Sequence, residues 1–212
     1  MSQPVVLTHP LVDHHLLTLR DRQTQPAAFR AALHRLSSML VVEATADLQT
    51  RSRRVTTPMA EAEGRRIAQT VGLAPILRAG LGMVDPALDL LPGAQVWHLG
   101  FYRDERTLEP VAYYSKLPAG AAVDVALVLD PMLATGGSAA AAIAAVRQWG
   151  ASRIKLLSIL AAPEGVARLQ AEAADVPIYT CAVDSHLDDR GYIVPGLGDA
   201  GDRVFNAETG SE

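Results

Sequence analysis

The middle of the chain alternates between short apolar runs and segments of helical periodicity, and this alternation most constrains the fold. The apolar runs cover residues 72–77, 96–101, 125–129, 154–160 and 176–183. The helical segments cover residues 82–91, 139–149 and 163–173. Strands that alternate with helices of about ten residues form parallel sheets with right-handed crossovers. The sequence therefore predicts an α/β fold, a parallel sheet flanked by helices.

Three further segments complete this prediction. Apolar residues at three- and four-residue spacings predict two helices within residues 1–46, with Pro26 early in the second. Residues 47–64 contain clustered arginines, and we expect an exposed β arm or loop there. Residues 111–116 are the expected hairpin partner of the strand at 96–101.

The composition excludes several classes of protein. Hydrophobic residues make up 49% of the chain and charged residues 20%, which is typical of a folded globular domain. The net charge of −4 disfavours binding by bulk phosphate neutralisation, so no nucleic-acid partner is expected. Cys181 is the single cysteine, which excludes an intrachain disulfide, and we expect no catalytic thiol.

The organisation of the chain is also predicted to be simple. No repeat or low-complexity linker interrupts it, so we expect a single domain over residues 1–212. We find neither a secretory signal nor an apolar stretch long enough to span a bilayer, and we therefore expect a cytoplasmic protein with no membrane partner.

The strongest local motif is a buried strand that ends in Asp130 and is followed by Thr135, Gly136 and Gly137 at the start of a helix. Free N–H groups and the dipole at a helix start suit a phosphate, and glycines allow close backbone approach. A carboxylate beside a phosphate needs another target, and vicinal sugar hydroxyls can both donate to it. The segment from Asp130 to Ser138 therefore predicts a ribose-5-phosphate site. The alternative is an ordinary turn in which Thr135 or Ser138 caps the helix.

Two arginines stand at the ends of other predicted strands. Arg78 follows the strand at 72–77, and Arg103 follows the strand at 96–101. Guanidinium groups suit doubly charged oxyanions, so the pair predicts stabilisation of a departing diphosphate. The alternative is that each is a surface residue or pairs with a nearby acid, namely Asp85, Asp104 or Glu105.

Taken together, the motifs closely resemble uracil phosphoribosyltransferases. The resemblance runs from about residue 9 to 205. The segments that carry it are 75–83, 102–103, 130–138 and 191–202, with weaker matches at 43–47 and 161–165.

The resemblance implies a type I phosphoribosyltransferase-like fold and a reaction. Uracil and 5-phosphoribosyl 1-diphosphate (PRPP) would give uridine 5′-monophosphate (UMP) and diphosphate, with Mg²⁺ as cofactor. Family members are usually dimers or larger homo-oligomers, and some are activated by GTP. The wider class carries two adjacent acids at the strand end, whereas Leu129 precedes Asp130 here. We therefore expect Mg²⁺ to be bound mainly through the diphosphate, with no metal ligand from the protein.

The resemblance also assigns residues. Arg78 and Arg103 would contact the diphosphate side of PRPP, Asp199 would also face PRPP, and Asp199 and Arg103 are the candidate catalytic residues. The remaining residues predicted to bind PRPP are Asp130, Pro131, Met132, Leu133, Ala134, Thr135, Gly136, Gly137 and Ser138. The residues predicted to bind uracil are Tyr192, Ile193, Gly198, Asp199 and Ala200.

The chemistry of the tail fits this assignment. Backbone N–H and C=O groups can match the polar edge of uracil where glycines permit close approach, as at Gly196, Gly198 and Gly201. Tyr192 is expected either to stack on the base or to pack in the core. We expect a dissociative displacement that depends on positioning and charge rather than on a covalent nucleophile. Asp199 has two candidate roles, to orient the donor or magnesium or to accept the N1 proton.

Three other functions remain open at this point. The first is transfer to another base, such as a purine. The second is a uracil-sensing RNA-binding regulator on the same fold, for which the basic candidates are Arg51, Arg53, Arg54, Arg65 and Arg66. The third is a module that binds the sugar diphosphate without turnover.

Overall fold

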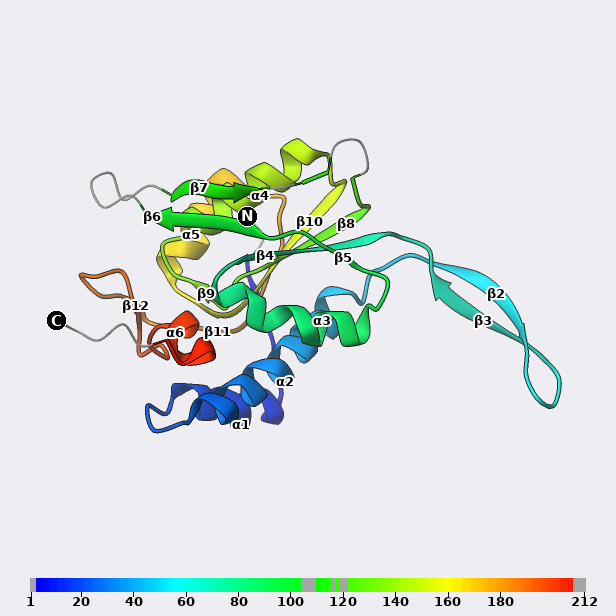
Figure 1. The fold of residues 1–212 in the computed structure, drawn as a ribbon, viewed down its shortest axis with the longest axis horizontal. Coiled ribbons are helices and arrows are strands. Elements are labelled where there is room, and N and C mark those ends of the chain that lie inside the picture. The colour runs from blue at the N-terminus through cyan, green and yellow to red at the C-terminus, as the bar shows by residue number, and fades with distance from the viewer. Residues whose placement is uncertain (1–2, 104–109, 116, 119–121, 208–212) are drawn as a thin grey trace.

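The computed structural model describes residues 3–103, 110–115, 117–118 and 122–207. A twisted sheet forms its centre, with strand order β1-β11-β10-β8-β4-β6-β7 (Figure 1). In that order the strands are Val5–Val6, Ile178–Val183, Arg153–Ala161, Val125–Leu129, Val71–Leu77, Leu99–Arg103 and Pro110–Ser115. Every pair along this path is parallel except β6 with β7. The predicted α/β fold and the predicted hairpin are therefore confirmed.

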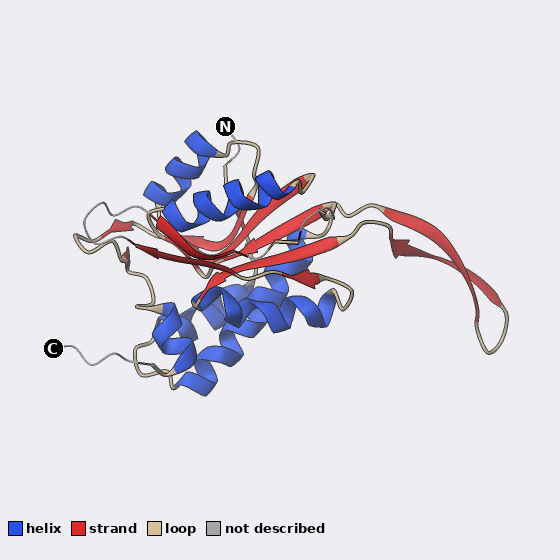
Figure 2. Ribbon diagram, turned by 45° about the horizontal axis from the view of Figure 1, so that its top comes forward, coloured by secondary structure: helices blue, strands red, loops and turns tan. Residues whose placement is uncertain are grey.

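Helices cover both faces of the sheet (Figure 2). One face packs against α1 (Pro10–Arg20), α2 (Pro26–Ala44), α3 (Val84–Leu90) and α6 (Ala200–Phe205). The other face packs against α4 (Gly137–Trp149) and α5 (Pro163–Glu172). Phe29, Leu33, Leu36 and Leu40 of α2 are at most 1% exposed, as their spacing predicts. Within the described residues, no helix combines the length and apolarity needed to cross a membrane.

The predicted arm is a hairpin of β2 (Thr50–Thr56) and β3 (Glu61–Ile67), which extends away from the sheet and helices (Figure 1). Nearly all of its side chains are exposed. Arg51 lies opposite Arg66, and Arg54 lies opposite Glu63. The arm reaches Ile67, three residues beyond the predicted limit.

Two predicted elements differ in detail. The strand predicted at 96–101 is broken into β5 (Gln95–Val96) and β6. The helix predicted at 82–91 begins as a 3₁₀ turn, η1 (Ala79–Met83), before α3. Within this turn Gly80 packs closely against β8, because a Cβ there would lie 2.4 Å from the carbonyl oxygen of Leu129. Residues 104–109, which connect the two strands of the predicted hairpin, and Lys116 lie outside the described residues.

The tail contains elements that the sequence did not predict. Two short strands, β12 (His186–Leu187) and β13 (Ile193–Val194), pair in antiparallel fashion, and α6 follows. Another short strand, β9 (Met132–Leu133), pairs with β10. These elements are too short for sequence periodicity to reveal them. The tail nevertheless packs on the rest of the chain, since α6 contacts α2 and η1.

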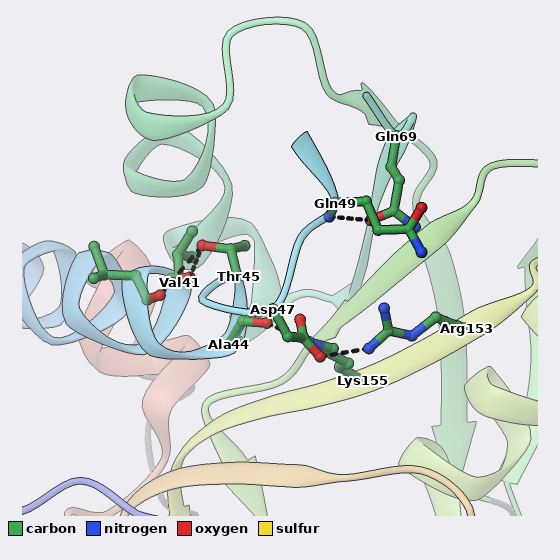
Figure 3. Close-up of polar contacts among 9 residues, drawn as sticks. Val41, Ala44, Thr45, Asp47, Gln49, Gln69, Arg153 and Lys155 are labelled. Atoms are coloured by element: carbon green, nitrogen blue, oxygen red, sulfur yellow. Dashed lines mark hydrogen bonds and ion pairs between the residues drawn. The ribbon is translucent and has the colours of Figure 1, made fainter. Parts of the chain in front are cut away.

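A polar network anchors α2 to the sheet (Figure 3). Lys155 on β10 is 2% exposed, and its Nζ donates to the carbonyl oxygen of Ala44 and to Oδ1 of Asp47, both at 2.5 Å. Arg153 donates to Oδ2 of the same carboxylate. Burial alone would raise the pKa of Asp47, but hydrogen bonds from Lys155 and Arg153 hold it below its usual value. A buried ammonium without partners is costly, so this network fixes the end of α2.

This network predicts a difference between two cations that share one carboxylate. Lys155→Met should lower the free energy of unfolding by about 2 kcal/mol, because the carbonyl of Ala44 loses its partner inside the protein. Arg153→Met should cost less than about 1 kcal/mol, because Arg153 is 42% exposed. Urea unfolding of both variants measures the difference. Equal losses would show that the buried bond to Ala44 contributes nothing.

Candidate active site

The ends of three neighbouring strands carry the charged residues singled out in the sequence. Strand β4 lies between β8 and β6, and it is parallel to both. Asp130 follows β8, Arg78 follows β4, and Arg103 is the last residue of β6. All three positions therefore lie at the carboxyl edge of the sheet, where open α/β sheets bind ligands. The side chain of Arg103 lies outside the described residues.

Asp130 lines two adjoining hollows at this edge. The larger has a volume of about 220 Å³, and the smaller has a volume of about 90 Å³. The carboxylate accepts one hydrogen bond, from the backbone N–H of Met132 at 3.2 Å. Burial outweighs this bond and raises the pKa of Asp130 to about 7. The side chain is therefore a hydrogen-bond acceptor whose charge changes near neutral pH.

The smaller hollow is formed by the loop from Asp130 to Ser138 and the start of α4. Gly136 precedes the helix with φ of +78°, a left-handed conformation that favours glycine. None of the described side chains caps the first turn of α4, so the alternative that Thr135 or Ser138 caps it is wrong. The N–H groups of that turn remain available to an anion.

The loop from Asp130 to Ser138 is held in place by contacts with β10 and α5. The backbone N–H of Leu133 donates to the Ser158 hydroxyl at 3.0 Å. Gly165 lies in the first turn of α5, and a Cβ there would lie 2.3 Å from the carbonyl oxygen of Ala134. This close approach explains the glycine in the segment 161–165, whose role the sequence did not reveal.

The close approach at Gly165 predicts that a side chain larger than hydrogen at this position disturbs the packing. Gly165→Ala should lower the free energy of unfolding by about 2 kcal/mol, because α5 and the loop must separate. Gly93→Ala is the matched control, since a Cβ there meets nothing within 4 Å, and its effect should stay within about 0.5 kcal/mol. Denaturant unfolding measures both, and a neutral Gly165→Ala would contradict the contact.

The larger hollow brings the tail against the strand ends. Its walls include every residue predicted to contact uracil, namely Tyr192, Ile193, Gly198, Asp199 and Ala200. Ala79, Asp130, Met132 and Ala134 form the opposite wall. Tyr192 is 40% exposed, so the alternative that it packs in the core is wrong. The guanidinium of Arg190 lies 5.5 Å from the centre of its ring.

Two acids connect the tail to the strand ends. Asp199 caps α6 by accepting a hydrogen bond from the backbone N–H of Asp202 at 2.8 Å. Asp202 in turn accepts a bond from Arg78 at 2.9 Å. The partner of Arg78 is therefore Asp202 rather than Asp85, while Asp104 and Glu105 lie outside the described residues. The sequence did not reveal this pair, because 124 positions separate its members and no local pattern marks it.

Other candidate groups can be placed as well. Within the described parts of the chain, no three His, Cys, Asp or Glu side chains gather as a set of metal ligands. Asp130 and Asp199 are the carboxylates that line the larger hollow. Burial raises the pKa of the Cys181 thiol to about 12, which keeps the thiol protonated and agrees with the prediction that it is not a nucleophile.

Comparison with known proteins places this geometry in a family. The family model described as "Uracil phosphoribosyltransferase" matches residues 6–207. The chain belongs to the uracil phosphoribosyltransferase family. A uracil phosphoribosyltransferase of Roseiflexus sp. (strain RS-1) is 60% identical over 205 residues, covering 97% of this chain and 99% of that protein. One from Symbiobacterium thermophilum is 50% identical over 209 residues, covering 98% of this chain and 100% of that protein.

Solved structures support the same fold. The AQ2163 protein from Aquifex aeolicus superposes with a TM-score of 0.91 at 37% identity, covering 98% of this chain and 100% of that chain. An adenine phosphoribosyltransferase from Trypanosoma brucei superposes with a TM-score of 0.52 at 15% identity, covering 80% of this chain and 69% of that chain. The second likeness concerns the fold alone. The predicted type I phosphoribosyltransferase-like fold is therefore confirmed.

Proposed function

We propose that this protein transfers the phosphoribosyl group of PRPP to uracil, giving UMP and diphosphate in pyrimidine salvage. Family membership over nearly the whole chain supports the reaction. The observation that carries the assignment of the site is that Asp130 lines both hollows. One residue thus joins a phosphate-sized space to a base-sized space, as a nucleotide product requires.

The donor would occupy the smaller hollow and its rim. Its 5-phosphate would accept hydrogen bonds from the backbone at the start of α4 and from the hydroxyls of Thr135 and Ser138. The ionised Asp130 carboxylate would accept from the two ribose hydroxyls. Met132, Leu133 and Ala134 line the smaller hollow between these groups, whereas Pro131 lines neither hollow. The carbonyl oxygen of Pro131 instead ties the loop to β10 by accepting from the backbone N–H groups of Ile159 and Leu160.

The leaving diphosphate would lie toward Arg78 and Arg103. Arg78 is 57% exposed, so its guanidinium is accessible, and the diphosphate would compete with Asp202 for it. Stabilisation of the departing negative charge favours cleavage at the anomeric carbon. Mg²⁺ would neutralise the diphosphate when bound, and it suits a site with few protein carboxylates because it retains several waters. Asp130 and Asp199, which line the larger hollow, would orient those waters.

Uracil would enter the larger hollow. The backbone groups of Ile193, Gly198 and Ala200 would read its polar edge, and the ring of Tyr192 would lie against the base. A site built from such groups rejects a base with a mismatched edge, because buried donors and acceptors are left unpaired. Asp199 would face both substrates, and its two candidate roles are retained in this proposal.

Asp130 predicts the pH dependence of donor capture. Its ionised form is the acceptor for the ribose hydroxyls, and its pKa in the free protein is raised to about 7. The kcat/KM for PRPP should therefore rise with pH and level off above about 7. Steady-state kinetics from pH 5.5 to 8.5, an interval of about three units centred on that pKa, measures the profile. If kcat/KM for PRPP in Asp130→Asn still fell toward low pH as in the native enzyme, Asp130 would not be the group that titrates.

The reaction itself has a direct test. The purified protein is incubated with uracil, PRPP and Mg²⁺, and UMP and diphosphate are quantified. Cytosine, adenine, guanine and hypoxanthine serve as competing bases, and we expect uracil to be preferred by at least about 100-fold. Faster transfer to a purine would show that the substrate is a purine rather than uracil. Binding of PRPP without formation of a nucleotide would favour a binding module.

Oligomeric state, activation and location complete the proposal. We expect a homodimer or larger homo-oligomer in the cytoplasm, with GTP as a candidate activator, because the family resemblance implies these properties. The arginines of the arm are a local basic surface on a chain whose net charge is −4. This negative net charge disfavours the RNA-binding alternative.

A further inference from the structure

The turn between β13 and α6 is tied to the rest of the protein through one residue, Gly196. Its backbone N–H donates to Oδ2 of Asp184 at 2.9 Å, and its carbonyl oxygen accepts from Nη1 of Arg20 at 2.9 Å. Its φ is +60°, and a Cβ there would lie 2.1 Å from the carbonyl oxygen of Ile193. Both polar groups of this residue are therefore bonded by side chains from distant parts of the sequence.

Arg20 and Asp184 also bind each other. Nη1 and Nη2 of Arg20 donate to the two oxygens of Asp184 at 2.8 and 2.6 Å. The Asp184 side chain is 5% exposed and that of Arg20 is 22% exposed. Burial alone would raise the pKa of Asp184, but hydrogen bonds from Arg20 and Gly196 hold it below its usual value. The pair is charged, planar and bidentate, which is the most directional form of ion pair.

The pair lies behind the larger hollow rather than in it. Arg20 is the last residue of α1, and Asp184 follows β11. Neither lines the larger hollow. Gly196, which they hold, lies in the sequence between Ile193 and Gly198, and both of these residues line the larger hollow. A second cation acts on the same turn, because Nη1 of Arg203 donates to the carbonyl oxygen of Leu197 at 2.7 Å.

We propose that Arg20 and Asp184 are positioning residues that set the backbone of residues 193–198 for recognition of uracil. This inference rests on the proposed function of the larger hollow as the base site. Recognition by backbone groups requires those groups to be held close to the productive geometry, and a turn cannot supply this rigidity alone. The bidentate pair supplies it by fixing the N–H and the C=O of Gly196 together.

The test separates positioning from general stability. Arg20→Ala breaks the pair, and Arg20→Lys retains a positive charge without the planar fork. The double variant Arg20→Met with Asp184→Leu replaces a buried ion pair with apolar side chains, which often leaves stability near that of the native protein. Arg147→Ala is the control, because it breaks an exposed ion pair in which Nη2 of Arg147 donates to both oxygens of Asp175, at 2.7 and 3.0 Å.

The readouts are kcat, the KM for each substrate and the thermal midpoint. The KM for uracil should rise by at least about tenfold in Arg20→Ala and in the double variant, with kcat and the KM for PRPP within about threefold. Arg20→Lys should give an intermediate KM for uracil, and Arg147→Ala should match the native enzyme. A KM for uracil that returns to the native value in the double variant would overturn the proposal, because the pair would then serve stability only.

A further variant separates failure of this inference from failure of the base site. Ala200→Leu places a larger side chain in the larger hollow and should raise the KM for uracil. If it does so while Arg20→Ala and the double variant leave that KM unchanged, the positioning role is overturned and the base site stands. If all three variants leave it unchanged, uracil binds elsewhere and both proposals are overturned.

Discussion

Parallel pairing of β6, β4 and β8 is the constraint on which the rest of this structure depends. Parallel strands end at the same edge of a sheet, so residues that are far apart in sequence lie close together in space. Asp130 and Arg78 take their positions from this pairing, and so does the backbone of Arg103. The register Pro75 to Leu129 between β4 and β8 places the end of each strand within a few residues of the other.

The same edge is completed by a tail that belongs to neither the central sheet nor its crossovers. Residues 191–193 and 198–201 line the larger hollow, and α6 begins at Ala200. Because an irregular segment has few backbone bonds of its own, it takes its shape from side chains elsewhere. Asp202 binds Arg78, while Gly196 is held by Arg20 and Asp184. The larger hollow is thus stabilised by charged side chains that do not themselves line it.

Burial of Asp130 connects structure with chemistry. A carboxylate at a strand end that is partly covered by the tail loses hydration, and its pKa rises to about 7. In the proposed site, sugar hydroxyls that donate to the ionised group would offset the cost of this burial. The described residues provide no side-chain cap for α4, and under the same proposal its unpaired N–H groups would bind the phosphate.

The sequence by itself determined the class of fold, the strand tips and the motifs. Hydrophobic periodicity is local, and so is the succession of Asp130, Thr135, Gly136 and Gly137, so both can be recognised without coordinates. Resemblance to the family also singled out five tail residues that line the larger hollow, whereas Gly191 and Gly201 line it without having been assigned to a substrate. The elements α6, β12 and β13 were missed because each is too short to repeat the helix or strand period more than once or twice.

Only the tertiary structure decided how these parts support one another. The partner of Arg78, the network around Lys155 and the pair that holds Gly196 all join residues more than a hundred positions apart. No local pattern marks such contacts, because an ion pair depends on where the chain returns in space and not on what lies beside it in sequence. The pKa of Asp130 belongs to the same category, since burial is a property of the folded whole.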